Sequence, residues 1–93
     1  MRLVAVCGSG LGSSFMMEMN INDVLRELGA TGVEVSHTDV GSATPDLADV
    51  WICATDIAES IQSLGEIVVL ENIIDKDLMR EKIKEMLVSK GLL

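Results

Sequence analysis

The chain begins with a short apolar run that leads into a loop of small residues and then into a helical pattern. Residues 3–6 are apolar throughout, which is typical of a strand buried on both faces of a parallel sheet. A strand that passes through a tight loop into an amphipathic helix is the opening unit of an α/β fold. The buried stripe of this helix is predicted at Met17, Ile21, Val24, Leu25 and Leu28.

Three further strands are predicted, at residues 33–38, 50–54 and 67–70. Residues 33–38 alternate between apolar and polar, as at a sheet edge, whereas residues 50–54 are apolar throughout, as in a central strand. Helical segments separate the strands, so the sheet should be parallel, with right-handed crossovers. We therefore expect a three-layer, Rossmann-like α/β fold with helices on both faces of a four-stranded parallel sheet of order 2-1-3-4.

Two more helices carry recognisable start signals. A helix over residues 55–61 is predicted to be capped by Thr55 or Asp56, with Glu59 completing a capping box. Asp75 is placed to cap a last helix. The whole chain, residues 1–93, is expected to form a single domain. The buried stripe of the last helix is predicted at Met79, Ile83, Met86 and Leu87.

Cys7 lies where the first strand should end and the loop of small residues begins. In a sheet of order 2-1-3-4 the strand order reverses between strands 1 and 3, and ligands bind at the carboxyl ends of the strands there. Backbone N–H groups of a glycine-rich loop and of a helix N-terminus favour anions. They also favour a thiolate over a thiol. Cys7 is therefore predicted to be a nucleophile at an anion site, able to carry a phosphoryl group on its sulfur.

Composition excludes several classes of protein. The formal net charge of −8 argues against a basic surface for nucleic acid. No apolar run approaches the ~18 residues of a transmembrane helix. There is no N-terminal targeting pattern either, so a cytoplasmic protein is expected. Cys7 and Cys53 lack the spacing of a zinc site, and a structural disulfide is not expected in the cytosol. We therefore expect no metal and no cofactor.

The loop differs from that of the cysteine phosphatases at one decisive position. Their CxxxxxR pattern would require an arginine at position 13, where this chain has Ser13. That arginine clamps the phosphate and stabilises the transition state. Without it, and without an evident general acid, a phosphocysteine would form but would not be hydrolysed quickly. A phosphoryl carrier is the favoured interpretation. A phosphatase-like hydrolase lacking its arginine and a regulatory module read through the state of Cys7 remain the alternatives.

Several stretches of the chain carry a family resemblance: VAVCGSGLGSS at 4–14, MN at 19–20, VLR at 24–26, HTDV at 37–40 and NIIDK at 72–76. In these stretches the chain resembles the IIB component of the bacterial phosphoenolpyruvate-dependent sugar phosphotransferase system. The ascorbate-type branch is the closest in pattern, within a group that includes galactitol-type and lactose/cellobiose-type IIB proteins. The loop here has Gly-Ser-Ser where ascorbate-type loops often have Gly-Thr-Ser.

This resemblance implies a function and a set of partners. Cys7 would accept a phosphoryl group from a phosphohistidine on a IIA protein. It would pass the group to a carbohydrate, ascorbate or a related sugar or polyol, that enters through a membrane IIC protein. The protein would then be cytoplasmic and only transiently at the inner face of the membrane. The resemblance also implies a phosphate cradle made of Gly8, Ser9, Gly10, Leu11, Gly12, Ser13 and Ser14.

Four other features have both a functional and an ordinary interpretation. His37, near the end of the second strand, could relay a proton or contact a partner, although a simply hydrogen-bonded histidine is favoured. Asp39 could orient His37 or start a turn. Cys53, inside an apolar run, is predicted to be a buried structural residue. Residues 15–19 are too apolar for one buried stripe, so part of them could form an adaptable partner surface beside Cys7.

Overall fold

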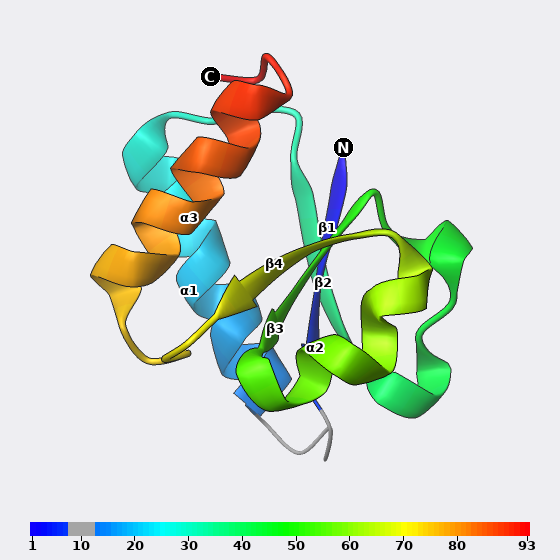
Figure 1. Cartoon of the computed structure of the whole chain (residues 1–93). Coiled ribbons are helices and arrows are strands. Elements are labelled where there is room, and N and C mark those ends of the chain that lie inside the picture. Colours follow the sequence, from blue (N-terminus) through cyan, green and yellow to red (C-terminus); the bar gives the residue numbers. More distant parts are fainter. Residues whose placement is uncertain (8–12) are drawn as a thin grey trace.

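A computed structural model describes residues 1–7 and 13–93, in which strands and helices alternate (Figure 1). The strands are β1 (Arg2–Cys7), β2 (Glu34–Asp39), β3 (Val50–Ala54) and β4 (Glu66–Leu70). The helices are α1 (Ser13–Leu28), α2 (Thr55–Ile61) and α3 (Lys76–Ser89). Short 3-10 turns cover Val40–Ser42 and Pro45–Leu47 between β2 and β3, and Gln62–Leu64 after α2.

The four strands form one parallel sheet in the order β2-β1-β3-β4, which confirms the predicted topology. β1 lies between β2 and β3, and all of its residues from Leu3 to Val6 are buried. β2 is an edge strand and is largely exposed, which agrees with its polar sequence. The carboxyl ends of all four strands therefore meet at one end of the molecule.

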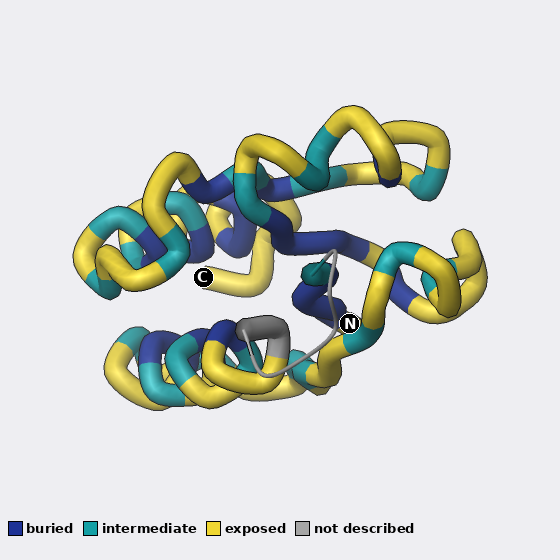
Figure 2. Tube along the Cα trace, turned by 90° about the horizontal axis from the view of Figure 1, so that it is seen from below, coloured by how far each residue is buried: buried dark blue, intermediate teal, exposed yellow. Residues whose placement is uncertain are grey.

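Side chains that alternate along the strands build two cores, one on each face of the sheet. On one face, Leu3 and Ala5 of β1 pack with the buried stripes of α1 and α3. On the other, Val6 and Trp51 pack with Ile61 of α2. Figure 2 views the molecule from the end where the strands finish and shows the buried residues along the strands and on the inner sides of the helices. The three-layer arrangement predicted from the sequence is thus confirmed.

The two caps predicted from sequence have different outcomes. Asp75 caps α3, because its carboxylate accepts a hydrogen bond of 3.1 Å from the backbone N–H of Leu78. The capping box predicted for α2 is wrong. The N-cap of α2 is Ala54, the last residue of β3, and it makes no side-chain capping hydrogen bond. The reason is that β3 passes directly into α2, so Asp56 already lies within the first turn of the helix, where a capping side chain no longer fits.

Ion pairs join the two helices that share a face of the sheet. Arg80 of α3 donates to the carboxylate of Glu27 in the last turn of α1, at 2.9 Å. Lys76, the first residue of α3, reaches Asp23 of α1 at 3.2 Å. These contacts hold α3 beside the second half of α1. The first two turns of α1 lie at the end of the sheet where β1 finishes.

Candidate functional site

Cys7 is the last residue of β1 and is half-buried. Leu3 and Ala5 face the core under α1 and α3, whereas Val4 and Val6 face the core under α2. Since side chains alternate along a strand, Cys7 belongs to the α1 and α3 face. Its register partner on β2 is Asp39. The thiol therefore lies at the carboxyl end of a central strand, where the order of the sheet reverses, as the sequence predicts.

The N-terminus of α1 lies at the same end of the sheet. α1 begins at Ser13, six positions after Cys7, and runs back along the sheet (Figure 1). The first four N–H groups of a helix have no acceptor within it, and they carry a partial positive charge. Such a helix start favours a thiolate and a bound phosphate for the same electrostatic reason. The first turn of α1 contains no acidic residue that would oppose this.

The predicted phosphate cradle is outside what the structure describes. Gly8, Ser9, Gly10, Leu11 and Gly12 lie outside the described residues, and so do the side chains of Ser13 and Ser14. The contribution of these seven residues to phosphate binding stays a prediction from the sequence.

His37 is hydrogen-bonded to Glu18, a residue that the sequence pattern did not mark as part of the site. The Nδ1 atom of His37 lies 3.0 Å from Oε2 of Glu18 on α1. The rings of His37 and Phe15 pack in a T-shaped arrangement with their centroids 5.6 Å apart. The hydrogen bond favoured for His37 is thus present, and a proton relay or a partner contact by this residue stays a prediction. The sequence does hold one sign of this contact. Phe15 and Glu18 are three residues apart, so they share one side of α1, and this side lies next to β2.

Asp39 starts a turn, which is one of the two interpretations given for it. Its Oδ1 accepts a hydrogen bond of 2.8 Å from the backbone N–H of Ser42, which caps the 3-10 turn after β2. Hydrogen bonds from Ser42 hold the pKa of Asp39 below its usual value. A carboxylate that stays ionised at the end of β2 contributes negative charge at the register partner of Cys7, and no described contact gives it a catalytic role.

Cys53 lies on β3 and is completely buried. Its register partner is Val6, so its side chain belongs to the α2 face, opposite to that of Cys7. Burial, and to a lesser extent the charge of Asp56, raises the pKa of the Cys53 thiol from 9.0 to about 11. The structural interpretation of Cys53 is thus supported by both its position and its chemistry.

The arginines lie away from the Cys7 end of the molecule. Arg2 starts β1, at the opposite end of the sheet. Arg26 is in the last turn of α1 and pairs with Asp23. Arg80 pairs with Glu27 and Asp77. Residues 8–12 contain no arginine in the sequence, so no arginine of this chain is placed to clamp a phosphate on Cys7.

Neither a metal site nor a membrane-spanning helix is found in the described ranges, 1–7 and 13–93. These ranges contain no group of three His, Cys, Asp or Glu side chains that could hold a metal ion. They also contain no helix that is long and apolar enough to cross a membrane.

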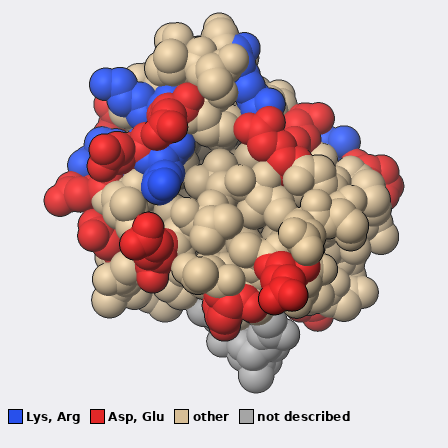
Figure 3. Space-filling view, viewed as in Figure 1, with Lys and Arg blue, Asp and Glu red and all other residues tan. Residues whose placement is uncertain are grey.

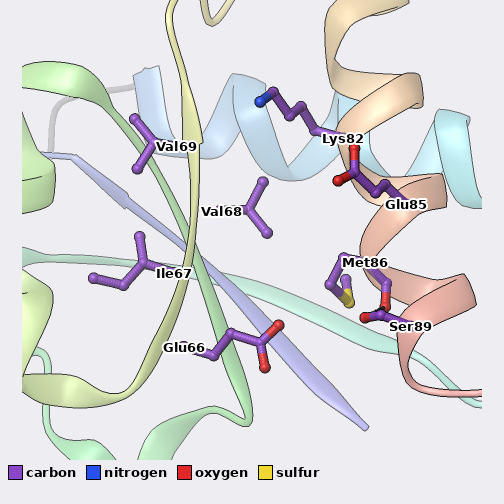
Figure 4. A pocket seen from close by; sticks show the side chains of 8 residues that line it. All are labelled: Glu66, Ile67, Val68, Val69, Lys82, Glu85, Met86 and Ser89. Carbon is purple, nitrogen blue, oxygen red and sulfur yellow. Dashed lines mark hydrogen bonds between the residues drawn. The ribbon is translucent and has the colours of Figure 1, made fainter.

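A groove of about 270 Å³ lies along the outer edge of β4, between Glu66 on the strand and Lys82 and Ser89 on α3 (Figure 4). None of the residues predicted for the site lines it.

Comparison with known proteins finds one family that the chain matches over most of its length. Residues 2–87 match the family of lactose/cellobiose-specific IIB subunits of the phosphotransferase system. Two curated relatives, from Salmonella choleraesuis and Salmonella typhimurium, are each described as an ascorbate-specific phosphotransferase system EIIB component. Each is 36% identical over 66 residues, which is 69% of this chain and 64% of the relative. The matched region thus spans less than two thirds of the relatives' length.

A solved structure shares the fold at low sequence identity. It is the lactose-specific IIB component domain from Streptococcus pneumoniae, with a TM-score of 0.59 and 17% identity. The match covers 99% of this chain and 96% of that one, so the whole α/β arrangement corresponds. Together with the match of the family model over residues 2–87, this shows that the chain belongs to the IIB subunit family of the phosphotransferase system.

Proposed function

We propose that this protein is a phosphoryl carrier in carbohydrate uptake, with Cys7 as the carrier residue. The observation that carries the proposal is the placement of Cys7, half-buried at the end of β1, directly before the loop that leads to the N-terminus of α1. Membership of the IIB family supports the same role. The donor would be a IIA protein phosphorylated on histidine, and the acceptor a carbohydrate bound by a membrane IIC protein.

The first step is an in-line substitution at phosphorus. The Cys7 thiolate attacks the phosphorus of a phosphohistidine that is protonated on its other ring nitrogen, and the S–P bond forms as the P–N bond breaks. The ring takes the bonding electron pair and leaves as neutral imidazole. In the second step a carbohydrate hydroxyl attacks the same phosphorus. The O–P bond forms, the S–P bond breaks, the hydroxyl proton goes to a base, and the Cys7 thiolate is restored. Nothing is oxidised or reduced, and neither step needs a metal or a nucleotide.

The surroundings of Cys7 would stabilise the charge on the phosphoryl oxygens. N–H groups at the start of α1 supply donors and a partial positive charge. The loop residues Gly8 to Gly12 and the hydroxyls of Ser13 and Ser14 would complete the cradle. A Gly12→Val substitution should reduce phosphoryl acceptance more than stability, because a β-branched side chain restricts the backbone that has to turn its N–H groups inward.

Two alternatives assign Cys7 a different task. A phosphatase-like hydrolase needs a group that activates water or stabilises the transition state of hydrolysis, and no arginine is placed to do so. A regulatory module would respond to the state of Cys7 without passing the phosphoryl group on. Transfer to a carbohydrate separates this module from a carrier, and turnover of an aryl phosphate identifies a hydrolase.

Ascorbate or a related sugar or polyol is our proposal for the carbohydrate. It rests on the two Salmonella relatives, which are described as ascorbate-specific. Transfer would take place in the cytoplasm, with the protein transiently at the inner face of the membrane through the IIC protein.

Intact-mass spectrometry tests the carrier role. The protein is incubated with phosphoenolpyruvate, the general phosphotransferase proteins and an ascorbate-type IIA, and wild type is compared with Cys7→Ser and Cys53→Ser. We expect one phosphoryl group on wild type and on Cys53→Ser, and none on Cys7→Ser. An unmodified wild type beside a phosphorylated IIA would overturn the proposed function for that donor class. An assay with an aryl phosphate would then identify a hydrolase.

A further inference from the structure

Four large apolar side chains are exposed near the N-terminus of α1. Phe15, Met16 and Met19 of α1 are 50%, 57% and 53% exposed, and Ile74, in the segment after β4, is 75% exposed. We call these four residues the α1 apolar surface. Met19 is three positions after Met16 and four after Phe15, so the α1 residues adjoin one another on the outer side of the helix. Large apolar side chains that cluster at a protein surface mark a site of interaction.

A small groove joins the helix to the segment after β4. It has a volume of about 150 Å³ and is lined by Met16, Met17 and Asn20 of α1 and by Ile73 and Ile74. Four of these five side chains are apolar, and Asn20 alone carries a hydrogen-bonding group. The volume is large enough for one apolar side chain of a partner. Methionine suits such a site, because its flexible and polarisable side chain adapts to the shape of what it contacts.

The groove and the α1 apolar surface lie at the end of the sheet where Cys7 lies. Met16 is in the first turns of α1, directly after the loop from Cys7, and Ile74 follows the carboxyl end of β4. In Figure 1 the start of α1 and the segment after β4 lie on the same side of the sheet. A donor phosphorus has to come within about 3–3.5 Å of the sulfur for in-line attack. A protein that carries this phosphorus must therefore cover the surface around Cys7.

Acidic residues outnumber basic ones at this end of the molecule. Asp39, Asp56, Glu71 and Asp75 all lie at or just after the carboxyl ends of β2, β3 and β4. Lys76, which directly follows Asp75 in the sequence, is paired with Asp23. Figure 3 shows Asp and Glu side chains at the end where the strands finish, with Lys and Arg nearer the other end of that face. An acidic rim repels a small anionic phosphate donor and attracts a protein with a basic surface.

We propose that the α1 apolar surface and its groove are the docking site of the phosphoryl donor. The donor is a protein that inserts an apolar side chain between Met16 and Ile74 and faces the acidic rim with lysine or arginine residues. This inference rests on the proposed function, since it names the partner surface for the transfer to Cys7. It accounts for the exposed methionines and for the acidic rim together: the apolar contacts hold the complex, and the charges speed encounter.

Charged substitutions in the groove test the inference. Met16→Glu and Ile74→Glu are compared with Val88→Glu, which makes the same charge change at a residue that is 53% exposed in the last turn of α3. Transfer from phosphorylated IIA to each protein is measured in a single turnover over a range of IIA concentrations. We expect the two groove variants to need about tenfold more IIA for half-maximal rate, as for loss of an interface contact of about 1.4 kcal/mol. Val88→Glu should behave as wild type.

Two further measurements separate docking from damage to the site. Alkylation of Cys7 by iodoacetamide should proceed at the wild-type rate in Ile74→Glu, which places its charge outside α1. Met16→Leu, which adds no charge to the first turn of α1, should keep most of the transfer. Raising the salt concentration should slow transfer from IIA in wild type, because the acidic rim and its basic partner are screened.

Each other outcome counts against the docking inference. Unchanged dependence on IIA concentration in both groove variants, with normal transfer in wild type, would overturn it and leave Cys7 as the carrier. Normal acceptance from IIA with loss of transfer to the carbohydrate would assign the surface to the membrane protein instead. A wild type that accepts no phosphoryl group would overturn the proposed function first, and the docking site with it.

Discussion

The two cysteines of this protein lie on neighbouring strands and are in opposite chemical situations. Cys7 ends β1, is half-buried, and belongs to the face under α1 and α3. Cys53 is one residue from the end of β3, is completely buried, and packs with Val6 and Trp51 on the face under α2. The difference does not come from the sheet, since both strands are central and parallel.

The connection after each strand decides the difference. β1 ends at Cys7, and five residues intervene before α1, three of which are glycine. β3 passes directly into α2, with Ala54 as the N-cap, and keeps Cys53 inside the strand. A thiol is a candidate nucleophile when it is the last residue of a strand, is only half-buried and precedes the N-terminus of a helix. The same thiol one residue inside a strand is a small core side chain.

The largest effect is expected for Cys7→Ser. This variant should accept no phosphoryl group, because a serine hydroxyl is a far weaker nucleophile than a thiolate. Its free energy of unfolding should stay within about 0.5 kcal/mol of wild type, as for a substitution outside the core. Phosphoryl acceptance is followed by intact mass, and unfolding by the fluorescence of Trp51, the single tryptophan, which is buried. Full acceptance by this variant would remove Cys7 from the mechanism.

Selective alkylation is the next largest expected effect. With a pKa raised from 9.0 to about 11, Cys53 at pH 8 holds a thiolate fraction about 100-fold below that of an ordinary thiol. Burial also keeps iodoacetamide away. The folded protein should therefore gain a single adduct, located on Cys7, and prior phosphorylation should protect it. In denaturant both cysteines should react. Equal labelling of Cys53 in the folded protein would contradict the contrast between the two sites.

Substitution of Cys53 should change stability and not function. Cys53→Ser places a hydroxyl in an apolar core and should cost about 1–3 kcal/mol of unfolding free energy, measured by urea titration. Phosphoryl acceptance by the folded variant should equal that of wild type. A folded Cys53→Ser protein that accepts less would show that the core of β3 takes part in the site.

The pH dependence of stability gives a second measure of Cys53. Its folded pKa of about 11 lies above the ordinary 9.0, so the unfolded chain loses this proton first as pH rises. Its contribution to stability is therefore complete below pH 9.0 and declines between pH 9.0 and about 11. Cys53→Ala removes the titrating group and should lose stability less steeply than wild type over this interval. Parallel curves for the two proteins would mean that the thiol titrates normally.

Much of this fold can be predicted from the sequence, because the strongest patterns here are local. The continuous apolar run at 50–54 coincides with β3, and the stripe of Met79, Ile83, Met86 and Leu87 is buried in α3 as predicted. The predicted cap of α2 is wrong because a sequence pattern marks only which side chains can cap. It does not show that the preceding strand already supplies the N-cap residue.

Contacts between distant residues could not be predicted in the same way. Glu18 and His37 are nineteen positions apart, and their hydrogen bond depends on the register of β2 beside β1 and on the rotation of α1 about its axis. The groove between Met16 and Ile74 likewise joins segments that only the packed structure brings together. The excess of apolar residues at 15–19 did predict an exposed surface, since one buried stripe cannot hold them all.

The smallest effect is expected for His37→Asn. The contact of His37 with Glu18 is partly exposed, 38% and 20% for the two side chains, and polar contacts of this kind contribute about 0–1 kcal/mol. The imidazole contacts Glu18 and Phe15, whereas the Asp39 carboxylate accepts a hydrogen bond from the backbone N–H of Ser42. We therefore expect transfer to Cys7 within about threefold of wild type, which corresponds to less than about 1 kcal/mol. Glu18→Gln, which keeps a hydrogen-bond acceptor, should change transfer less still. A loss of transfer in His37→Asn as large as that in Cys7→Ser would make the histidine part of the reaction, and would extend the site from the end of β1 to β2.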